Sequence, residues 1–347
     1  MERRTLLLST AAPAILGAAG KSGARPPILG SGEHTYEAIH DWGELPAGLR
    51  WGNTHGVVED SQGHIYIAHT SHASAERHDT LVVFDRKGKY IRSWGAAFRG
   101  GAHGLHLRKE GRDEFLYFVD TGKGRPGGGI SAKDTWMVKM TLQGEEVLRI
   151  GYPKEAPGYK PDGSTKFSPT NVAIAPNGDI YLADGYGAYY INQYDARGKF
   201  IRSFGGNGKE PGQLAAPHGL MVDTRGKDPY LLVADRTNNR LQRFTLDGRH
   251  LGFDGGVNLP CHFHERKGVA VIPDLAARVT LLDRDNKVIA HLGEDSTGDW
   301  QELRKKPRGE FRAGKFVSPH GACFDHAGNI FVTEWVEVGR VTKLRRV

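Results

Sequence analysis

The phrase His-Gly stands four times in this chain, each time directly before a run of strand-forming residues. The copies begin at His55, His103, His218 and His320, at intervals of one or two lengths of a repeat of about 45 to 70 residues. Repeats of this length are typical of solenoids and propellers, whose units bury their apolar surfaces against one another. Because a repeat brings one position of every unit to equivalent places, histidines at that position can meet and hold a metal ion.

The clearest unit covers residues 171–205 and predicts four short strands. Tight turns with the sequences Pro-Asn-Gly-Asp at 176–179 and Asp-Ala-Arg-Gly at 195–198 separate runs rich in β-branched and aromatic residues. Four short strands joined by glycine turns are typical of one propeller blade. The next unit, which begins at His218, repeats the pattern and resembles the NHL repeat.

The other units predict the number of blades. Weaker or interrupted copies cover residues 55–95, 103–151 with a glycine-rich insertion at 122–129, and 260–293. The last unit begins at residue 318 and reaches the chain end after three strands, whereas residues 36–43 resemble the outer strands at 89–95 and 200–205. An N-terminal strand that completes the last blade would leave no long sheet edge open. The sequence therefore predicts an all-β, six-bladed β-propeller over residues 35–347.

Composition agrees with a turn-rich β protein. Hydrophobic residues make up 38% of the chain, which contains 47 glycines and 17 prolines. The net charge of +7 is spread over turns and is not accompanied by a basic helix or a known nucleic-acid motif. We therefore expect a small-molecule or peptide substrate as partner, and no nucleic acid.

The N-terminus predicts export. Residues 1–24 contain Arg3-Arg4, a short apolar stretch and small residues, which is the layout of a twin-arginine-like signal peptide. The apolar stretch is too short for a comfortable transmembrane helix. We expect a periplasmic or secreted protein without a stable membrane span after signal cleavage. Cys261 and Cys323 are the two cysteines, and their repeat positions favour buried free thiols over a disulfide.

The residues that open the inner strands predict a metal site. Around the ring they are His55, His103, Asn171, His218, His262 and His320. Blades two, four and six are related by a third of a turn, so His103, His218 and His320 can converge on one ion. Three neutral imidazoles with an open fourth position are the usual catalytic arrangement for zinc. His55 and His262 could bind a second ion or support the first.

Several phrases resemble the peptidyl-α-hydroxyglycine α-amidating lyases, a family of zinc-dependent propellers. They include Asp79-Thr80-Leu81-Val82-Val83-Phe84-Asp85, the three His-Gly phrases at His103, His218 and His320, Ala183-Asp184-Gly185-Tyr186 and Ala234-Asp235-Arg236. The resemblance implies that the three histidines hold zinc and that Tyr186 and Arg236 act on the substrate. It also implies cleavage of a carbinolamide C–N bond, which gives an amide and glyoxylate.

Three positions depart from the family pattern. Thr70 stands where the family has a catalytic arginine, and Arg77 in a nearby loop is a candidate substitute. Gly321 replaces an acidic residue that helps to hold a structural calcium, which makes calcium doubtful as a second cofactor, and Gly187 replaces a disulfide cysteine.

Two other functions remain open. The first is a non-enzymatic periplasmic NHL propeller that binds a ligand or protein, because propellers host many functions. The second is a metal-dependent, lactonase-like hydrolase, although such calcium sites need oxygen ligands and the ring positions here are mostly imidazoles. The chain also lacks a segment that resembles the copper monooxygenase half of the amidating system, so a different hydroxylated or carbonyl substrate is an alternative.

Overall fold

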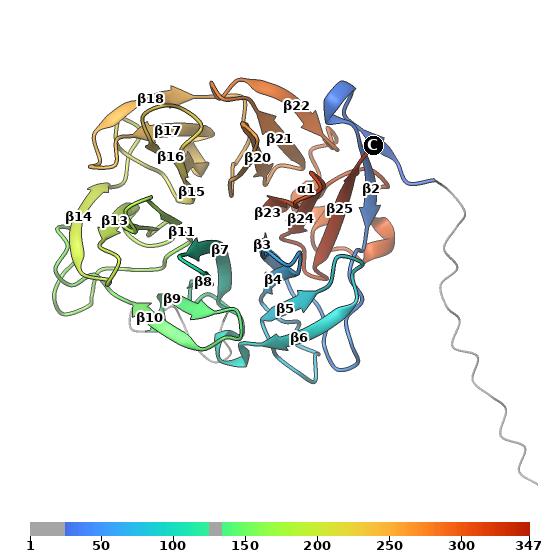
Figure 1. Ribbon diagram of the computed structural model, residues 1–347, viewed down its shortest axis with the longest axis horizontal. Coiled ribbons are helices and arrows are strands. Elements are labelled where there is room, and N and C mark those ends of the chain that lie inside the picture. Colours follow the sequence, from blue (N-terminus) through green and yellow to red (C-terminus); the bar gives the residue numbers. More distant parts are fainter. Residues whose placement is uncertain (1–24, 125–133) are drawn as a thin grey trace, which may run out of the picture.

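The chain forms a six-bladed β-propeller, in which six antiparallel sheets surround a central channel (Figure 1). The computed structural model describes residues 25–124 and 134–347. The predicted signal segment at 1–24 and residues 125–129 of the glycine-rich insertion lie outside the described residues. The predicted fold class is confirmed.

Each blade runs from an inner strand beside the channel to an outer strand. Blade one comprises β3 (Thr54–Glu59), β4 (Ile65–His69), β5 (Leu81–Phe84) and β6 (Tyr90–Trp94). Blade two comprises β7 (Ala102–Glu110), β8 (Asp113–Asp120), β9 (Trp136–Thr141) and β10 (Glu146–Ile150). Blade three comprises β11 (Asn171–Ile174), β12 (Ile180–Ala183), β13 (Tyr190–Tyr194) and β14 (Phe200–Gly205).

The second half of the chain repeats this order. Blade four comprises β15 (Pro217–Asp223), β16 (Tyr230–Asp235), β17 (Arg240–Phe244) and β18 (His250–Asp254). Blade five comprises β19 (His264–Arg266), β20 (Val269–Asp274), β21 (Arg278–Leu282) and β22 (Val288–Leu292). Blade six takes β23 (Pro319–Phe324), β24 (Ile330–Glu334) and β25 (Arg340–Arg346) from the C-terminal end. A single turn of α-helix, α1 (Trp300–Leu303), lies between blades five and six in the sequence.

The N-terminal strand completes blade six, as predicted. Strand β2 (Tyr36–His40) pairs antiparallel with β25, with Ala38 opposite Leu344. A short strand that the sequence did not predict, β1 (Ile28–Leu29), adds a fifth strand outside β2. Hydrogen bonds between the two ends of the chain therefore close the ring (Figure 1).

The hydrophobic core lies between the blades. Successive residues of a strand point to opposite faces of its sheet. Apolar residues at successive positions therefore cover both faces of a blade, and each face packs against a neighbouring blade. In β12, Ile180 and Leu182 pack toward blade two, whereas Tyr181 and Ala183 pack toward blade four. Six such clusters join the six pairs of neighbouring blades. This packing fixes the angular position of each inner strand, and with it the residue that opens the strand.

Two smaller predictions can be compared with the structure. Cys261 and Cys323 are both buried and free, so no disulfide joins them. Within residues 25–124 and 134–347, none of the helices has the length and apolar character needed to cross a bilayer.

Candidate metal centre

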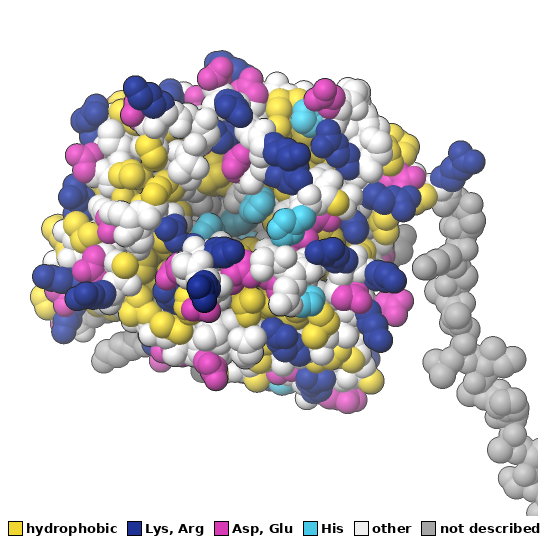
Figure 2. Space-filling model, viewed as in Figure 1, with side chains coloured by type: hydrophobic (Ala, Val, Ile, Leu, Met, Phe, Trp, Pro, Cys, Tyr) yellow, Lys and Arg dark blue, Asp and Glu magenta, His cyan; other side chains and the backbone are white. Residues whose placement is uncertain are grey.

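Three histidines of the His-Gly phrases meet at one end of the channel. Each is the second residue of an inner strand, His103 in β7, His218 in β15 and His320 in β23, and their side chains are nearly or fully buried. The ring centroids lie 4.8 Å apart for His103 and His218, 4.7 Å for His103 and His320, and 4.8 Å for His218 and His320. This nearly equilateral triangle is the arrangement expected for histidines of alternate blades. Figure 2 shows histidine side chains near the hollow centre of one face of the ring.

Each of these three histidines is held in the same way by the next blade. The Nδ1 atom of each ring lies within hydrogen-bond distance of a backbone carbonyl there. The pairs are His103 with Thr170 at 2.7 Å, His218 with Cys261 at 2.8 Å and His320 with His55 at 3.2 Å. A carbonyl only accepts, so each Nδ1 carries the hydrogen and each Nε2 keeps a lone pair. Among the described residues, the ligating atoms that lie within 4.8 Å of one another form two groups, His55 with His103 and His320, and His218 with Cys261 and His320. The three predicted ligands therefore belong to two groups that share His320.

The glycine after each histidine makes this arrangement possible. A Cβ atom at these positions would collide with the same carbonyl oxygen that accepts the histidine hydrogen bond. The separations would be 2.6 Å from Gly104 to Thr170, 2.7 Å from Gly219 to Cys261 and 2.1 Å from Gly321 to His55. The two residues of the His-Gly phrase therefore act together: the glycine leaves room for the carbonyl of the next blade, and this carbonyl orients the imidazole.

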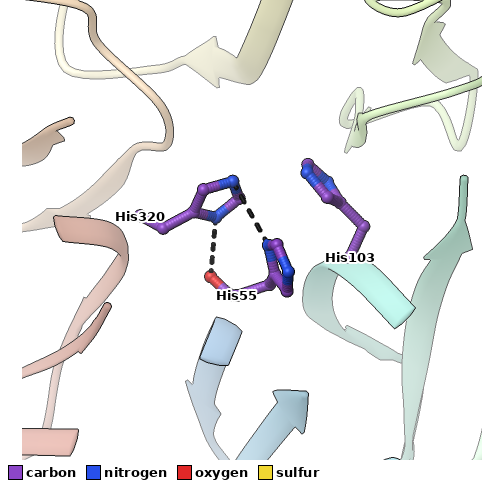
Figure 3. Close-up of side chains that lie close together, drawn as sticks. All are labelled: His55, His103 and His320. Carbon is purple, nitrogen blue, oxygen red and sulfur yellow. Dashed lines mark hydrogen bonds between the residues drawn. The ribbon is translucent and has the colours of Figure 1, made fainter. Parts of the chain in front are cut away.

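His55 joins this cluster as a fourth imidazole. Its Nδ1 lies 3.3 Å from Nε2 of His320 (Figure 3), and since that Nε2 carries a lone pair, His55 donates the hydrogen. The ligating atoms of His55, His103 and His320 all lie within 4.8 Å of one another. The sequence placed His55 near a metal as a supporting residue or a ligand of a second ion, and the structure places it against His320.

His262 does not accompany His55. Its Nδ1 is 2.8 Å from Nδ2 of Asn171, and its side chain lines a separate cavity of about 230 Å³ together with His106 and His264. The suggested pairing of His55 and His262 around a second ion is therefore not formed. The inner strand of blade five begins only at His264, so this blade lacks the repeat geometry that directs the other histidines.

A polar anchor fixes the loop that leads to the channel position in four blades. The last residue of the second strand, or in blade three the residue directly after it, accepts a hydrogen bond from the backbone N–H three residues before the residue that faces the channel. In blade one, the Gly52 N–H donates to Nδ1 of His69 at 3.3 Å. In the other three blades the acceptor is a carboxylate at 2.7 Å from the donor: Ser168 donates to Asp184, Ala215 to Asp235 and Val317 to Glu334. The anchors are buried, and they hold the loops that lead to His55, His218 and His320 as well as the loop that leads to Asn171.

The same anchors place the two predicted catalytic residues. Tyr186 follows Asp184 by two residues, and Arg236 follows Asp235 directly. The Tyr186 hydroxyl lies 2.9 Å from Nε2 of His218 and 3.2 Å from Nε2 of His103, and it accepts a hydrogen bond of 3.3 Å from Arg236. Both residues therefore reach the cluster, and the Tyr186 hydroxyl lies between two of the imidazole lone pairs.

The cluster opens into a cavity of about 530 Å³ with a basic wall. His55, His103 and Tyr186 line it together with Arg99 and Lys123, and the described lining residues include no carboxylate. The Lys123 ammonium lies 3.5 Å from the centre of the Tyr186 ring. Sequence reasoning missed Lys123 because it follows the second strand of blade two without a motif of its own.

The residues that depart from the family pattern, Thr70 and Gly321, and the candidate substitute Arg77 lie in different surroundings. Thr70 lines the cavity, whereas the Arg77 guanidinium donates to Asp79 at 2.7 Å and to Ser93 at 2.9 Å in blade one. Arg77 is thus not a substitute for the missing arginine. The backbone leaves no room for a side chain at Gly321, where the family has its acidic residue.

Burial decides the protonation of the cluster. It lowers the pKa of His103, His218 and His320 well below the usual value, and neighbouring cationic groups lower it further. The imidazoles are therefore neutral at pH 7, as metal ligation requires. Burial also raises the pKa of Tyr186, while Arg236 opposes this shift. Neutral imidazoles suit zinc, whereas calcium prefers carboxylate and carbonyl oxygens, so the residues present fit zinc and do not fit calcium.

Comparison of sequences connects the chain with amidating enzymes. No family model matches. The chain is 30% identical over 178 residues to peptidyl-glycine alpha-amidating monooxygenase B of Xenopus laevis, and this alignment covers 47% of this chain and 17% of that protein. It is 28% identical over 214 residues to a probable peptidyl-alpha-hydroxyglycine alpha-amidating lyase of Caenorhabditis elegans, which covers 56% of each. The matches thus span about half or less of these relatives.

Solved structures share the fold. Virginiamycin B lyase from Staphylococcus aureus superposes with a TM-score of 0.55 at 13% identity, over 90% of this chain and all (100%) of that one. A gluconolactonase from Xanthomonas campestris gives a TM-score of 0.59 at 13% identity, over 93% and 95% of the two chains. The chain is thus an NHL-like propeller that resembles the amidating lyases in sequence and shares its fold with lyases and lactonases.

Proposed function

We propose that this protein is a zinc-dependent lyase of the amidating-lyase type, which cleaves the C–N bond of a carbinolamide to an amide and an α-oxo acid such as glyoxylate. One observation carries the proposal. Three neutral imidazoles of alternate blades lie with their ring centroids 4.7–4.8 Å apart, each with an Nε2 lone pair, and the Tyr186 hydroxyl lies between two of these nitrogens. His103, His218 and His320 would hold the ion. When bound, zinc would lower the pKa of the substrate hydroxyl, as it does for water.

The surrounding residues would then move the proton. The hydroxyl proton leaves as the C–N bond breaks, and the amide nitrogen must gain a proton, so one group can take the first and return it as the second. Tyr186 is within reach of the cluster and receives a hydrogen bond from Arg236. Arg236 and Lys123 both lie against the Tyr186 ring, so their charges would favour the phenolate form during the transfer.

The basic cavity indicates the kind of substrate. A wall with Arg99 and Lys123 and no carboxylate among its described residues favours a substrate with an anionic group. In this proposal Lys123 binds the substrate carboxylate that becomes the carboxylate of glyoxylate. Lys123 would thus supply a positive charge that the family arginine, replaced here by Thr70, does not supply. The twin-arginine-like sequence at residues 1–24 supports an activity outside the cytoplasm.

Metal content and product formation test the proposal in order. Purified protein should contain about one zinc per chain, and His103→Ala should lose it. A peptide that ends in α-hydroxyglycine should release glyoxylate in the presence of the wild-type protein and not of His103→Ala. Native protein free of metal would refute the zinc site. Bound zinc without glyoxylate release would keep the site and refute this substrate.

The alternative functions give different results. A non-enzymatic binding propeller would keep its ligand after all three histidines are replaced together. A lactonase-like hydrolase that depends on calcium would need oxygen ligands, and the cluster offers imidazoles instead.

A further inference from the structure

A buried thiol lies beside two of the three imidazoles, those of His218 and His320. Cys261 precedes His262 in the loop that enters blade five, and its side chain is fully buried. Its backbone oxygen is the one that orients His218. The sulfur of Cys261 and the ligating nitrogens of His218 and His320 all lie within 4.8 Å of one another. The side chain thus faces the metal centre from a blade that contributes no histidine to it.

The surroundings of Cys261 differ from those of an ordinary core cysteine. Cys261 belongs to none of the apolar clusters formed by the described residues. Its thiol lies 3.5 Å from the backbone oxygen of Leu259 and contacts the guanidinium of Arg236. Burial raises the pKa of the Cys261 thiol to about 12, although the Arg236 guanidinium opposes this shift, so the thiol is protonated at pH 7 in the metal-free protein. Cys323, in contrast, packs among Val57, Phe331 and other apolar side chains between blades six and one.

We propose that Cys261 is a sulfur ligand of the metal centre, in addition to the imidazoles of His103, His218 and His320. The inference rests on the proposed zinc site. The thiol would release its proton on binding, and a thiolate makes the site prefer zinc, cobalt or another borderline or soft ion over calcium or magnesium. His103, His218, His320 and Cys261 would then supply three nitrogens and one sulfur to the ion, a donor set that suits zinc.

Cobalt reports this ligand directly, because a thiolate bound to Co²⁺ gives a near-ultraviolet charge-transfer band that imidazoles do not give. The chain has only two cysteines, so Cys323→Ser is a matched control for Cys261→Ser. Metal-free protein is titrated with CoCl₂ and its absorption is recorded. We expect the charge-transfer band in wild type and Cys323→Ser, and its loss in Cys261→Ser while the visible bands of bound cobalt persist.

The outcomes separate this inference from the function proposed above. Bound cobalt without a charge-transfer band in wild type, or a band that survives in Cys261→Ser, would overturn the sulfur ligand and leave the imidazole site standing. Failure of wild type to bind cobalt or zinc would overturn both. X-ray absorption of the zinc-loaded wild type needs no variant: a sulfur at about 2.3 Å is expected, and a spectrum with nitrogen and oxygen only would refute the proposal.

Discussion

The Tyr186 hydroxyl lies 2.9 Å from Nε2 of His218, although the two residues stand on different blades. His218 donates its single N–H, at Nδ1, to the Cys261 carbonyl, so its Nε2 can only accept from Tyr186. The tyrosine is therefore the hydrogen-bond donor to a predicted metal ligand. A metal ion that takes this lone pair would release the hydroxyl for contact with a substrate.

Removal of that hydroxyl should separate chemistry from metal binding. Tyr186→Phe deletes the proposed proton-transfer group, whose contribution is typically about 10²- to 10⁴-fold. We expect kcat for glyoxylate release to fall by that factor while zinc content stays unchanged. Tyr194→Phe is the control, since the buried Tyr194 hydroxyl has no hydrogen-bond partner among the described residues. Equal activity of the two variants would remove Tyr186 from the mechanism.

A methyl group on Gly104 should damage the metal centre without touching a ligand. Its Cβ would lie 2.6 Å from the Thr170 oxygen, so Gly104→Ala must shift the carbonyl that orients His103. We expect zinc affinity to fall about 10- to 100-fold, the usual effect of losing such a partner, and unfolding free energy to fall by about 1–3 kcal/mol. Gly226→Ala, where a Cβ meets nothing within 4 Å, should change neither. Wild-type affinity in Gly104→Ala would refute this reading of the His-Gly phrase.

Loss of the Lys123 charge should weaken binding of an anionic substrate. Lys123 lines the cavity beside Tyr186, and a hydrogen bond to a charged group contributes about 1.5–3 kcal/mol. We expect Lys123→Met to raise KM about tenfold or more for a substrate with a free carboxylate, and to have little effect on its amide. The exposed Lys209 provides the control variant Lys209→Met. The same loss for both substrates would show that Lys123 does not bind the carboxylate.

Stability of the metal-free protein should fall on acidification. Burial lowers the pKa of His69 and of His262 to about 3, and it lowers that of the cluster histidines as well. Below pH 6.5 the histidines of the unfolded chain bind protons that the folded chain excludes. The contribution of these neutral histidines to the free energy of unfolding is therefore complete above pH 6.5 and is lost as the pH falls toward 3. At pH 5 the loss is about 2 kcal/mol for each such histidine.

Three carboxyl groups act in the opposite direction, because burial raises the pKa of Glu59 as well as that of Asp184 and Asp274. Burial raises the pKa of Asp184 and of Asp274 to about 6, so acidification from pH 6 to pH 4 favours the folded state at these two positions. Because the buried histidines outnumber them, urea unfolding in the presence of a chelator should give a lower free energy at pH 5 than at pH 7.5. Higher stability at pH 5 would contradict the neutral state of the buried imidazoles.

The sequence alone determined the repeat, and the repeat determined the ring. Strand alternation and turn residues are local signals, and the resemblance of residues 36–43 to the outer strands was enough to predict that β2 completes blade six. The convergence of His103, His218 and His320 followed from the same periodicity, because equal blades place equal positions around one axis.

Only the tertiary structure decided what surrounds those histidines. The roles of Thr170, Cys261 and His55 as carbonyl partners, the contact of His55 with His320 and the place of Lys123 depend on how one blade docks on the next. Such contacts join residues far apart in the chain through loops whose course no local pattern specifies. The spacing of the His-Gly phrases can be read from the sequence. The reason for the glycine cannot, because it is the close approach of a carbonyl oxygen from the neighbouring blade.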